Sequence, residues 1–341
     1  MSDTHGHTGE DLLAHPPQAA AVHGHAHGVV DAALLTAERG MWAIKWSLVG
    51  LLATAVFQVV VVLLSGSVAL LADTVHNFGD AATAIPLGIA FTLSRLRPTR
   101  RFTYGLGRAE DLAGVVIVGI MLFSALFAGY QSVDRLLHPR EVGYIWAVAA
   151  AALVGFLGNE AVAVFRIRVG REIGSAALVA DGQHARVDGL TSLAVLLGAA
   201  GAWAGYPRAD PIVGLVITAV IFRIVWQSGR AVFSHLLDGV DPQVVEEIRH
   251  AVEAAEGVRE VGEVRVRWLG HRLHAEVNIA VNPSLTVDKG HSIAVEARHQ
   301  LLHHLRYLSN ATIHVDPAQA SGEGFHLIED HAHDGLKVHS H

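Results

Sequence analysis

The stretch DTVHNFGD at residues 73–80 sets aspartate and histidine side chains into an otherwise apolar run. A related stretch, DGQHARVD, follows at residues 181–188. With the alanine that precedes each copy, the two share the pattern A-D-x-x-H-x-x-x-D. A repeated pattern of this kind predicts two related helices that contribute to one site.

In each copy the histidine and the last aspartate are four residues apart. On a helix such residues lie on one face, about one turn or ~5.4 Å from each other. The first copy therefore places His76 beside Asp80, and the second places His184 beside Asp188. Two such helices facing each other would bring two imidazoles and two carboxylates together, a ligand set that zinc accepts.

A lone histidine or aspartate near a helix end is more often a cap or an interfacial residue than a ligand. Here the pattern occurs twice, in apolar segments of membrane length, where ionisable groups are costly and tend to mark ion pathways. This favours a metal site. Asp73 and Asp181 precede the histidines by one turn and could orient them by hydrogen bonds, cap a helix or line an access route. Glu160, also at membrane depth, could relay protons or join helices by a hydrogen bond.

Composition indicates a membrane protein. The chain of 341 residues is 51% hydrophobic and 17% charged, with a mean hydropathy of +0.38. Soluble domains carry about 25% charged residues. The net charge of −7 argues against a nucleic-acid partner, for which a basic face is expected. Because cysteine is absent, disulfide and thiolate sites are excluded.

A six-helix transmembrane domain is expected at residues 41–236, since each bilayer crossing takes about 20 apolar residues. The apolar stretches lie near residues 41–64, 68–93, 111–134, 142–167, 174–203 and 210–235. Arginine is concentrated in the second and fourth connections, at positions 95, 97, 100, 101 and 108 and at positions 166, 168 and 171. The positive-inside rule then places these connections and both termini in the cytoplasm. Few lysines and much alanine, valine and glycine suggest a bacterial chain, and hence the bacterial plasma (inner) membrane.

Histidine-rich tails are expected at residues 1–40 and 318–341, where no apolar periodicity is present. We expect both tails to be disordered, and tracts of this composition can bind metal loosely. The first tail has no basic region followed by an apolar one, so it is not expected to be a cleaved signal peptide.

Residues 241–317 have the composition of a soluble domain. Asp241 followed by Pro242 predicts the start of a helix over residues 242–256. Two alternating stretches then predict strands around residues 264–268 and 274–281, followed by a helix over 286–304 and a strand over 312–316. The order αββαβ indicates a small two-layer, ferredoxin-like domain of the metallochaperone type.

The same alternation places His274 and Glu276 on the sheet face opposite the core, together with His314 and Asp316. His291, near the start of the second helix, could join them. On pattern alone, this set is as compatible with an exposed polar face as with a second metal site.

Taken together, these features resemble the cation diffusion facilitator family of zinc/proton antiporters over roughly residues 41–317. The motifs that carry the resemblance are LAD-x-x-H-x-x-x-D at 71–80, H-x-x-x-D at 184–188, YG-x-GR-x-E at 104–110 and HVDP at 314–317. The resemblance implies a homodimer that works by alternating access, with transport ligands His76, Asp80, His184 and Asp188.

The resemblance also implies metal ligands in the cytosolic domain, where zinc would act as a regulatory ligand. His291, His314 and Asp316 match family ligand positions, and His274 is a looser match. In this family a basic residue at the position of Arg108 pairs with an acid at the position of Asp238, near the dimer interface.

The ligand types suggest how such a site would work. Zinc needs neutral imidazole and ionised carboxylate, so binding displaces protons and release favours their return. A site open alternately to each side would therefore export zinc from the cytoplasm in exchange for protons, without a nucleotide, since no P-loop is present. Cobalt, iron and cadmium remain open as alternative metals. Two other classes also remain: a membrane-embedded metal sensor or scaffold, and an intramembrane zinc hydrolase, which would need an open metal position.

Overall fold

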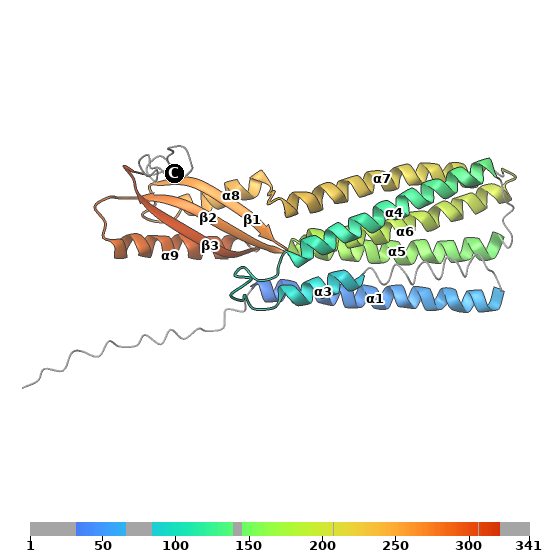
Figure 1. Ribbon diagram of the computed structural model, residues 1–341, viewed down its shortest axis with the longest axis horizontal. Helices are drawn as coiled ribbons and strands as arrows, with labels where there is room; N and C mark the ends of the chain where they lie inside the picture. Colours follow the sequence, from blue (N-terminus) through green and yellow to red (C-terminus); the bar gives the residue numbers. More distant parts are fainter. Residues whose placement is uncertain (1–31, 66–83, 139–144, 207, 306, 321–341) are drawn as a thin grey trace, which may run out of the picture. The chain divides into compact units, whose positions relative to one another are not determined.

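The computed structural model describes residues 32–65, 84–138, 145–206, 208–305 and 307–320. Long helices are followed by a small mixed domain, as Figure 1 shows. The predicted fold class, a helical membrane protein with a C-terminal αββαβ domain, is confirmed. The helices of the first part are α1 (Ala32–Ser65), α3 (Ala84–Ser94), α4 (Ala109–Leu137), α5 (Ile145–Ile173), α6 (Ala176–Trp203) and α7 (Ala209–Leu236).

Within these described residues, five helices are long and apolar enough to cross a membrane. The exception is α3, an apolar helix of 11 residues. It covers the end of the predicted second span, and residues 68–83 of that span lie outside the described part of the chain. On the outer faces, Phe123 of α4 and Trp226 of α7 are 71% and 74% exposed, as expected for side chains that meet lipid.

Two helix boundaries differ from the sequence-based expectation. The first helix begins at Ala32, so residues 32–40, which we expected in the disordered tail, are helical. This segment, AALLTAERG, is rich in strong helix formers, and Ala37 is fully buried. Similarly, α5 continues to Ile173 instead of ending near residue 167. In both cases the hydrophobic pattern marks the apolar stretch, whereas the helix itself continues beyond it.

A tight turn joins α5 to α6. Gly174 adopts a left-handed conformation with φ of 71°, which glycine tolerates without a steric penalty. Ser175 then caps α6, because its side chain accepts a hydrogen bond from the backbone N–H of Leu178. The start of α6 is therefore fixed only two residues after the end of α5.

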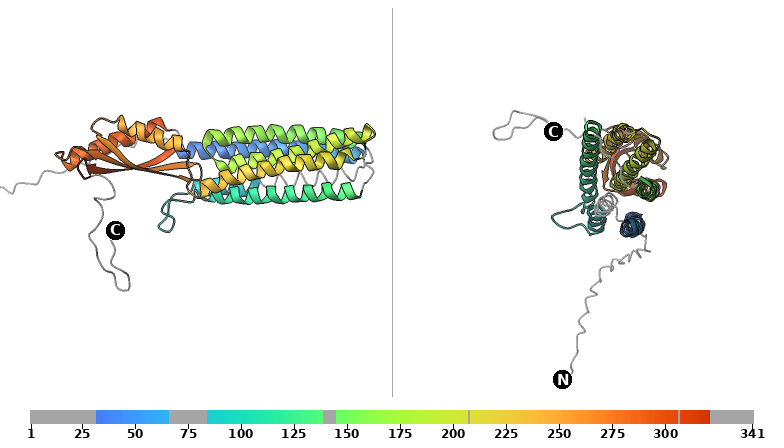
Figure 2. Two further views of the ribbon diagram at one scale, coloured as in Figure 1. Left: turned by 90° about the horizontal axis from the view of Figure 1, so that it is seen from above. Right: turned by 90° about the vertical axis from the view of Figure 1, so that its right-hand side faces the viewer.

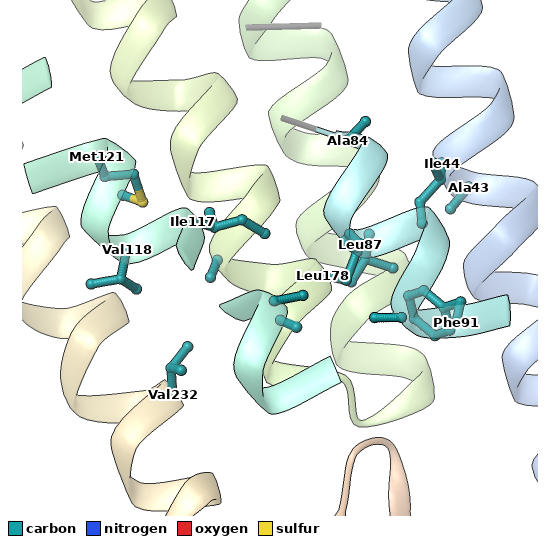
Figure 3. Close-up of a cluster of buried hydrophobic side chains, with 14 of the residues drawn as sticks. Ala43, Ile44, Ala84, Leu87, Phe91, Ile117, Val118, Met121, Leu178 and Val232 are labelled. Carbon is teal, nitrogen blue, oxygen red and sulfur yellow. The ribbon is translucent and has the colours of Figure 1, made fainter. Parts of the chain in front are cut away.

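The core of the helical domain lies where α3 meets α1, α4 and α6. Figure 3 shows Leu87 and Phe91 of α3 close to Leu178 of α6, with Ile117 of α4 beside them. All four are fully buried. This cluster fixes the relative positions of the helices at one end of the domain.

The C-terminal domain is a three-stranded sheet with two helices on one face, as the left view of Figure 2 shows. Its elements are α8 (Pro242–Glu253), β1 (Glu260–Leu269), β2 (Arg272–Val281), α9 (Val287–His304) and β3 (Leu308–Pro317). Strand β2 is central; it pairs antiparallel with β1 and parallel with β3. Asp241 caps α8 as expected, with Pro242 at the first helical position.

Candidate metal centre

Helix α6 carries one half of the predicted transport site. His184 and Asp188 lie one turn apart, with 3.8 Å between Nε2 and the carboxylate oxygen Oδ2. The residues are only 1% and 5% exposed. The arrangement expected from their spacing is therefore present, in a buried position on a helix long enough to span a membrane.

The other half, His76 and Asp80, lies outside the described residues, as does Asp73. The four predicted transport ligands are therefore not described together. In the described part of the chain, no group of three or more histidine, aspartate or glutamate side chains is arranged to hold a metal ion.

Asp181 is engaged in an ion pair across the helix interface. Its carboxylate lies 2.9 Å from Nη1 of Arg166 on α5, and the two side chains are 0% and 1% exposed. The Nε of Arg166 also donates a hydrogen bond of 2.8 Å to Ser47 on α1. The pair thus joins three helices next to His184. Sequence reasoning missed it, because Arg166 was assigned to a cytoplasmic connection instead of to the helix.

A second ion pair between α5 and α6 lies close to the site. Arg186 donates two hydrogen bonds to the carboxylate of Glu160, at 2.7 and 3.1 Å. Arg186 lies inside the second motif, between the two candidate ligands. Of the two roles considered for Glu160, the structure places it in a contact between helices.

Glycine lets α5 and α6 pack closely at the site. A Cβ atom added to Gly182 would come within 2.9 Å of the backbone nitrogen of Ile167. Gly189, one residue after Asp188, likewise faces the backbone of Phe156 and Glu160. Small residues of this kind allow helix backbones to approach within a membrane, so the ligand-bearing helix is held firmly against its neighbour.

The predicted pair of Arg108 and Asp238 is also brought together. Nη2 of Arg108 lies 2.5 Å from Oδ1 of Asp238, and Nη1 donates to the carbonyl oxygen of Leu236 at 2.9 Å. Both side chains are more than a third exposed. Asp238 adopts a φ of 59°, a left-handed conformation that few residues other than glycine, asparagine and aspartate accept.

In the cytosolic domain, the predicted ligands are only partly assembled. Nε2 of His314 lies 2.9 Å from Oδ1 of Asp316. His274 is opposite Asn310 in the β2–β3 register, four residues before His314, which corresponds to about 13 Å along the strand. His291 is exposed in the first part of α9.

His274 instead lies beside the loop that precedes α4. Its ring is 6.3 Å from that of Tyr104, whose hydroxyl accepts a hydrogen bond from Arg267. Burial lowers the pKa of His274 below its ordinary value, and the nearby guanidinium groups of Arg267 and Arg272 lower it further. This environment favours the neutral imidazole.

Comparison with known proteins adds independent information. The family described as "Cation efflux transmembrane domain" matches residues 44–237, and "Cation efflux protein, cytoplasmic domain" matches residues 240–318. A "Probable cation efflux system protein" of Mycobacterium tuberculosis is 50% identical over 320 residues, covering 94% of this chain and 96% of that protein.

More distant relatives include one whose name mentions manganese. The manganese efflux system protein MneP of Bacillus subtilis is 24% identical over 294 residues, covering 83% of this chain and 99% of that protein. The magnetosome protein MamB of Paramagnetospirillum magneticum is 25% identical over 278 residues, covering 81% and 94%. Among solved structures, the manganese form of a MamM C-terminal domain is 28% identical, covers 22% of this chain and 95% of its own, and has a TM-score of 0.22.

Proposed function

Because the chain belongs to the cation diffusion facilitator family of cation efflux proteins, we propose that it exports zinc from the cytoplasm in exchange for protons. Membership of the family confirms the coarser predictions. The protein is an integral membrane transporter of divalent metal cations, and it is not an enzyme. The choice of zinc and the coupling to protons are our proposal.

The observation that carries the proposal is the buried pair of His184 and Asp188 on α6. We propose that His76 and Asp80 complete this pair from the second span. Two imidazoles and two carboxylates suit a tetrahedral zinc ion. Magnesium and calcium prefer six or more oxygen ligands, and copper(I) prefers sulfur, so this set disfavours all three.

Proton coupling would follow from the same ligands. A histidine must lose its proton, and an aspartate must be ionised, before either can bind zinc. An inward proton gradient would then favour zinc release on the outer side. We propose that both termini face the cytoplasm of a bacterial inner membrane, because arginine gathers in the second connection and in the last turns of α5.

The other predicted residues take supporting roles in the proposal. Asp181, paired with Arg166, would hold α6 in place, and Asp73 would act similarly or line the access route.

The match to the cytoplasmic dimerisation region suggests a homodimer. We propose that His291, His314 and Asp316, with His274 as a weaker candidate, bind regulatory zinc using ligands from both copies. The domain limits at residues 40, 236, 241 and 317 remain predictions, except that helix α1 includes residues 32–40.

The test is metal flux in vesicles. Purified protein would be placed in vesicles with a zinc-sensitive dye and a pH-sensitive dye, and zinc would be compared with cobalt, iron(II), cadmium and manganese. An antiporter moves zinc and protons in opposite directions. Binding without flux would instead identify a sensor or scaffold. Faster flux of manganese than of zinc would overturn the metal assignment, and flux without proton movement would overturn the exchange mechanism.

A further inference from the structure

We propose that His271 is a positioning residue for transport. Through Glu110 and Ser175, it would connect the tip of the β1–β2 hairpin to the first turns of α4 and α6. Through these contacts, the position of the cytosolic domain would influence the position of α6, the helix that carries His184. The proposal rests on the transport function proposed above, and its test includes a measurement that does not depend on flux.

The hairpin tip is buried, which is unusual for a tight turn. Connections of this kind normally lie on the surface, where water satisfies their polar groups. His271, between β1 and β2, is nevertheless only 2% exposed. Gly270 beside it has a φ of 64°. The common two-residue hairpin turns need a positive φ at their first position, which glycine supplies. The polar side chain of His271 therefore lies in the protein interior and not at its surface.

A buried carboxylate at the start of α4 accepts a hydrogen bond from the tip. Nδ1 of His271 lies 2.6 Å from Oε1 of Glu110, and both side chains are at most 1% exposed. The carboxylate of the next residue, Asp111, is also buried. Buried polar groups are costly unless paired, so the contact of His271 with Glu110 fixes the tip against the first turn of α4.

The contact continues to α6. The Ser175 hydroxyl donates to the second oxygen of Glu110 at 3.3 Å, while it accepts the capping hydrogen bond from Leu178. His184 follows Ser175 by nine residues of continuous helix, about 13.5 Å along its axis. A displacement of His271 would therefore move the Glu110 carboxylate and, through it, Ser175 at the N-terminus of α6.

The backbones at this contact leave no free space. A Cβ atom at Gly107 would lie 2.6 Å from the carbonyl oxygen of Leu269, and one at Gly270 would lie 2.6 Å from the carbonyl oxygen of Gly107. Arg272, just after the tip, donates to the carbonyl oxygen of Ser94 at the end of α3. The tip contacts α4 and α3 directly and α6 only through Glu110, so it cannot shift without moving at least one of these helices.

A purely structural role for Glu110 is the competing explanation. An acidic residue in the first turn stabilises a helix through its dipole, but this effect does not require the residue to be buried. The dipole explains neither the burial of His271 nor the contact with Ser175. The two explanations differ in one respect: only the positioning role requires a donor at the location of Nδ1.

The experiment uses the full-length protein in vesicles and compares His271→Asn with His271→Gln. The asparagine amide can occupy the location of Nδ1, whereas the longer glutamine amide extends to that of Nε2. For His271→Gln we expect the maximal zinc flux to fall between about 2-fold and 30-fold, the range for residues that couple two sites, with half-saturating zinc unchanged. His271→Asn should retain most of the flux.

Glu110→Gln should reduce flux as His271→Gln does, and the double variant should be no slower than the slower single variant. The matched control is His138→Gln, which alters an exposed pair of the same chemistry, with Nδ1 3.2 Å from Asp134. Full flux in His271→Gln, or equal losses in the asparagine and glutamine variants, would overturn the proposal. Additive losses in the double variant would do the same.

Amide hydrogen exchange of the first turns of α6 provides the measurement that is independent of flux. We expect faster exchange in His271→Gln and near wild-type exchange in His271→Asn and His138→Gln. If the wild-type protein moves no metal, the transport function fails, yet exchange still tests the link from His271 to α6. Unchanged exchange in His271→Gln would overturn that link. Should the glutamine variant not fold, Glu110→Gln, which alters the same contact without removing the cap of α6, takes its place.

Discussion

Two ion pairs join α5 to α6 within the helical domain. Asp181 is paired with Arg166, and Glu160 with Arg186. Pairing reduces the cost of placing charge away from water, and the removal of one partner leaves the other charge uncompensated. In the proposed transport site, His184 and Asp188 would form a different kind of pair, because both would bind the same metal ion.

The first prediction concerns this pair. Asp188→Ala should reduce zinc flux at least about 100-fold, since even residues that only orient metal ligands contribute 10- to 100-fold to affinity. The measurement is initial flux in vesicles, with Asp134→Asn as a control acid near the end of α4. The protein should remain a folded dimer by size exclusion. Undiminished flux in Asp188→Ala would remove Asp188 from the transport site.

The second prediction concerns Arg108 and Asp238. Asp238 has a positive φ, so an alanine there would add backbone strain, whereas asparagine tolerates this conformation. We therefore expect Asp238→Asn and Arg108→Gln each to weaken transport, with a non-additive double variant. Because both side chains are more than a third exposed, the stability coupling should be no more than about 1 kcal/mol. Strict additivity of both flux and stability would argue against a functional pair.

The third prediction is a pH dependence from His274. Burial, and then Arg267 and Arg272, hold its pKa below the ordinary value of 6.5. As pH falls below about 6.5, the unfolded chain takes up a proton on this residue before the folded chain does, so stability falls. The loss ends below the folded-state pKa. In chelator, His274→Asn should flatten the fall of the melting temperature between about pH 7 and 5. Parallel curves for variant and wild type would contradict this.

At the scale of elements, periodicity and composition predicted most of the architecture. The strands and helices of the C-terminal domain follow from alternation and from the cap at Asp241, because these signals are local. Hydropathy did not predict the start of α1 or the end of α5, because it detects apolar stretches and a helix can continue past them. Local sequence thus identifies an element better than it identifies its limits.

The candidate site was predictable where its residues share one helix. The spacing of His184 and Asp188 is sufficient to place them together. The contacts of Asp181 with Arg166 and of Glu110 with His271 join residues that are distant in sequence, and no periodicity reports such pairs. They depend on how helices and domains pack, which one sequence alone does not specify.

The fourth prediction concerns the packing of α5 against α6. Gly182→Ala would place a Cβ atom 2.7 Å from Cγ1 and 2.9 Å from the backbone nitrogen of Ile167, so the helices must separate. We expect a loss of about 1–3 kcal/mol in stability, the usual cost of overpacking, visible as a lower melting temperature in detergent.

The control for this variant is Gly88→Ala on α3, where nothing lies within 4 Å of the added atom. There, the higher helix propensity of alanine should leave stability unchanged or raise it by up to about 1 kcal/mol. Equal effects at the two positions would show that close packing of α5 and α6 is not what Gly182 provides.

At the scale of the whole molecule, the described residues of the C-terminal domain form a core separate from the buried clusters of the helical domain. Val277 and Ile279 of the sheet, with Ile248 of α8 and Leu301 of α9, belong to a cluster distinct from that of the helical domain. A fragment of residues 241–317 therefore has its own buried core and is expected to fold.

The fifth prediction tests regulatory zinc with this fragment. Calorimetry should detect zinc binding that is lost in His291→Ala with His314→Ala, and sedimentation should show a dimer tightened by zinc. Of the four predicted ligands, the described residues of one chain bring together His314 and Asp316 but not His274 or His291, so a complete site is expected to use two copies. The matched control is His250→Ala with His304→Ala, two exposed histidines on α8 and α9. Retained binding in the first variant would place the site elsewhere.

The buried tip of the β1–β2 hairpin limits how freely this protein can be recombined with its relatives. A chimera joined near residue 240 would combine one helical domain with the cytosolic domain of another family member. Such a graft would bring a foreign side chain opposite Glu110 and a foreign backbone opposite Gly107. A functional chimera is therefore expected to take residues 107–110 and residues 269–272 from the same parent protein.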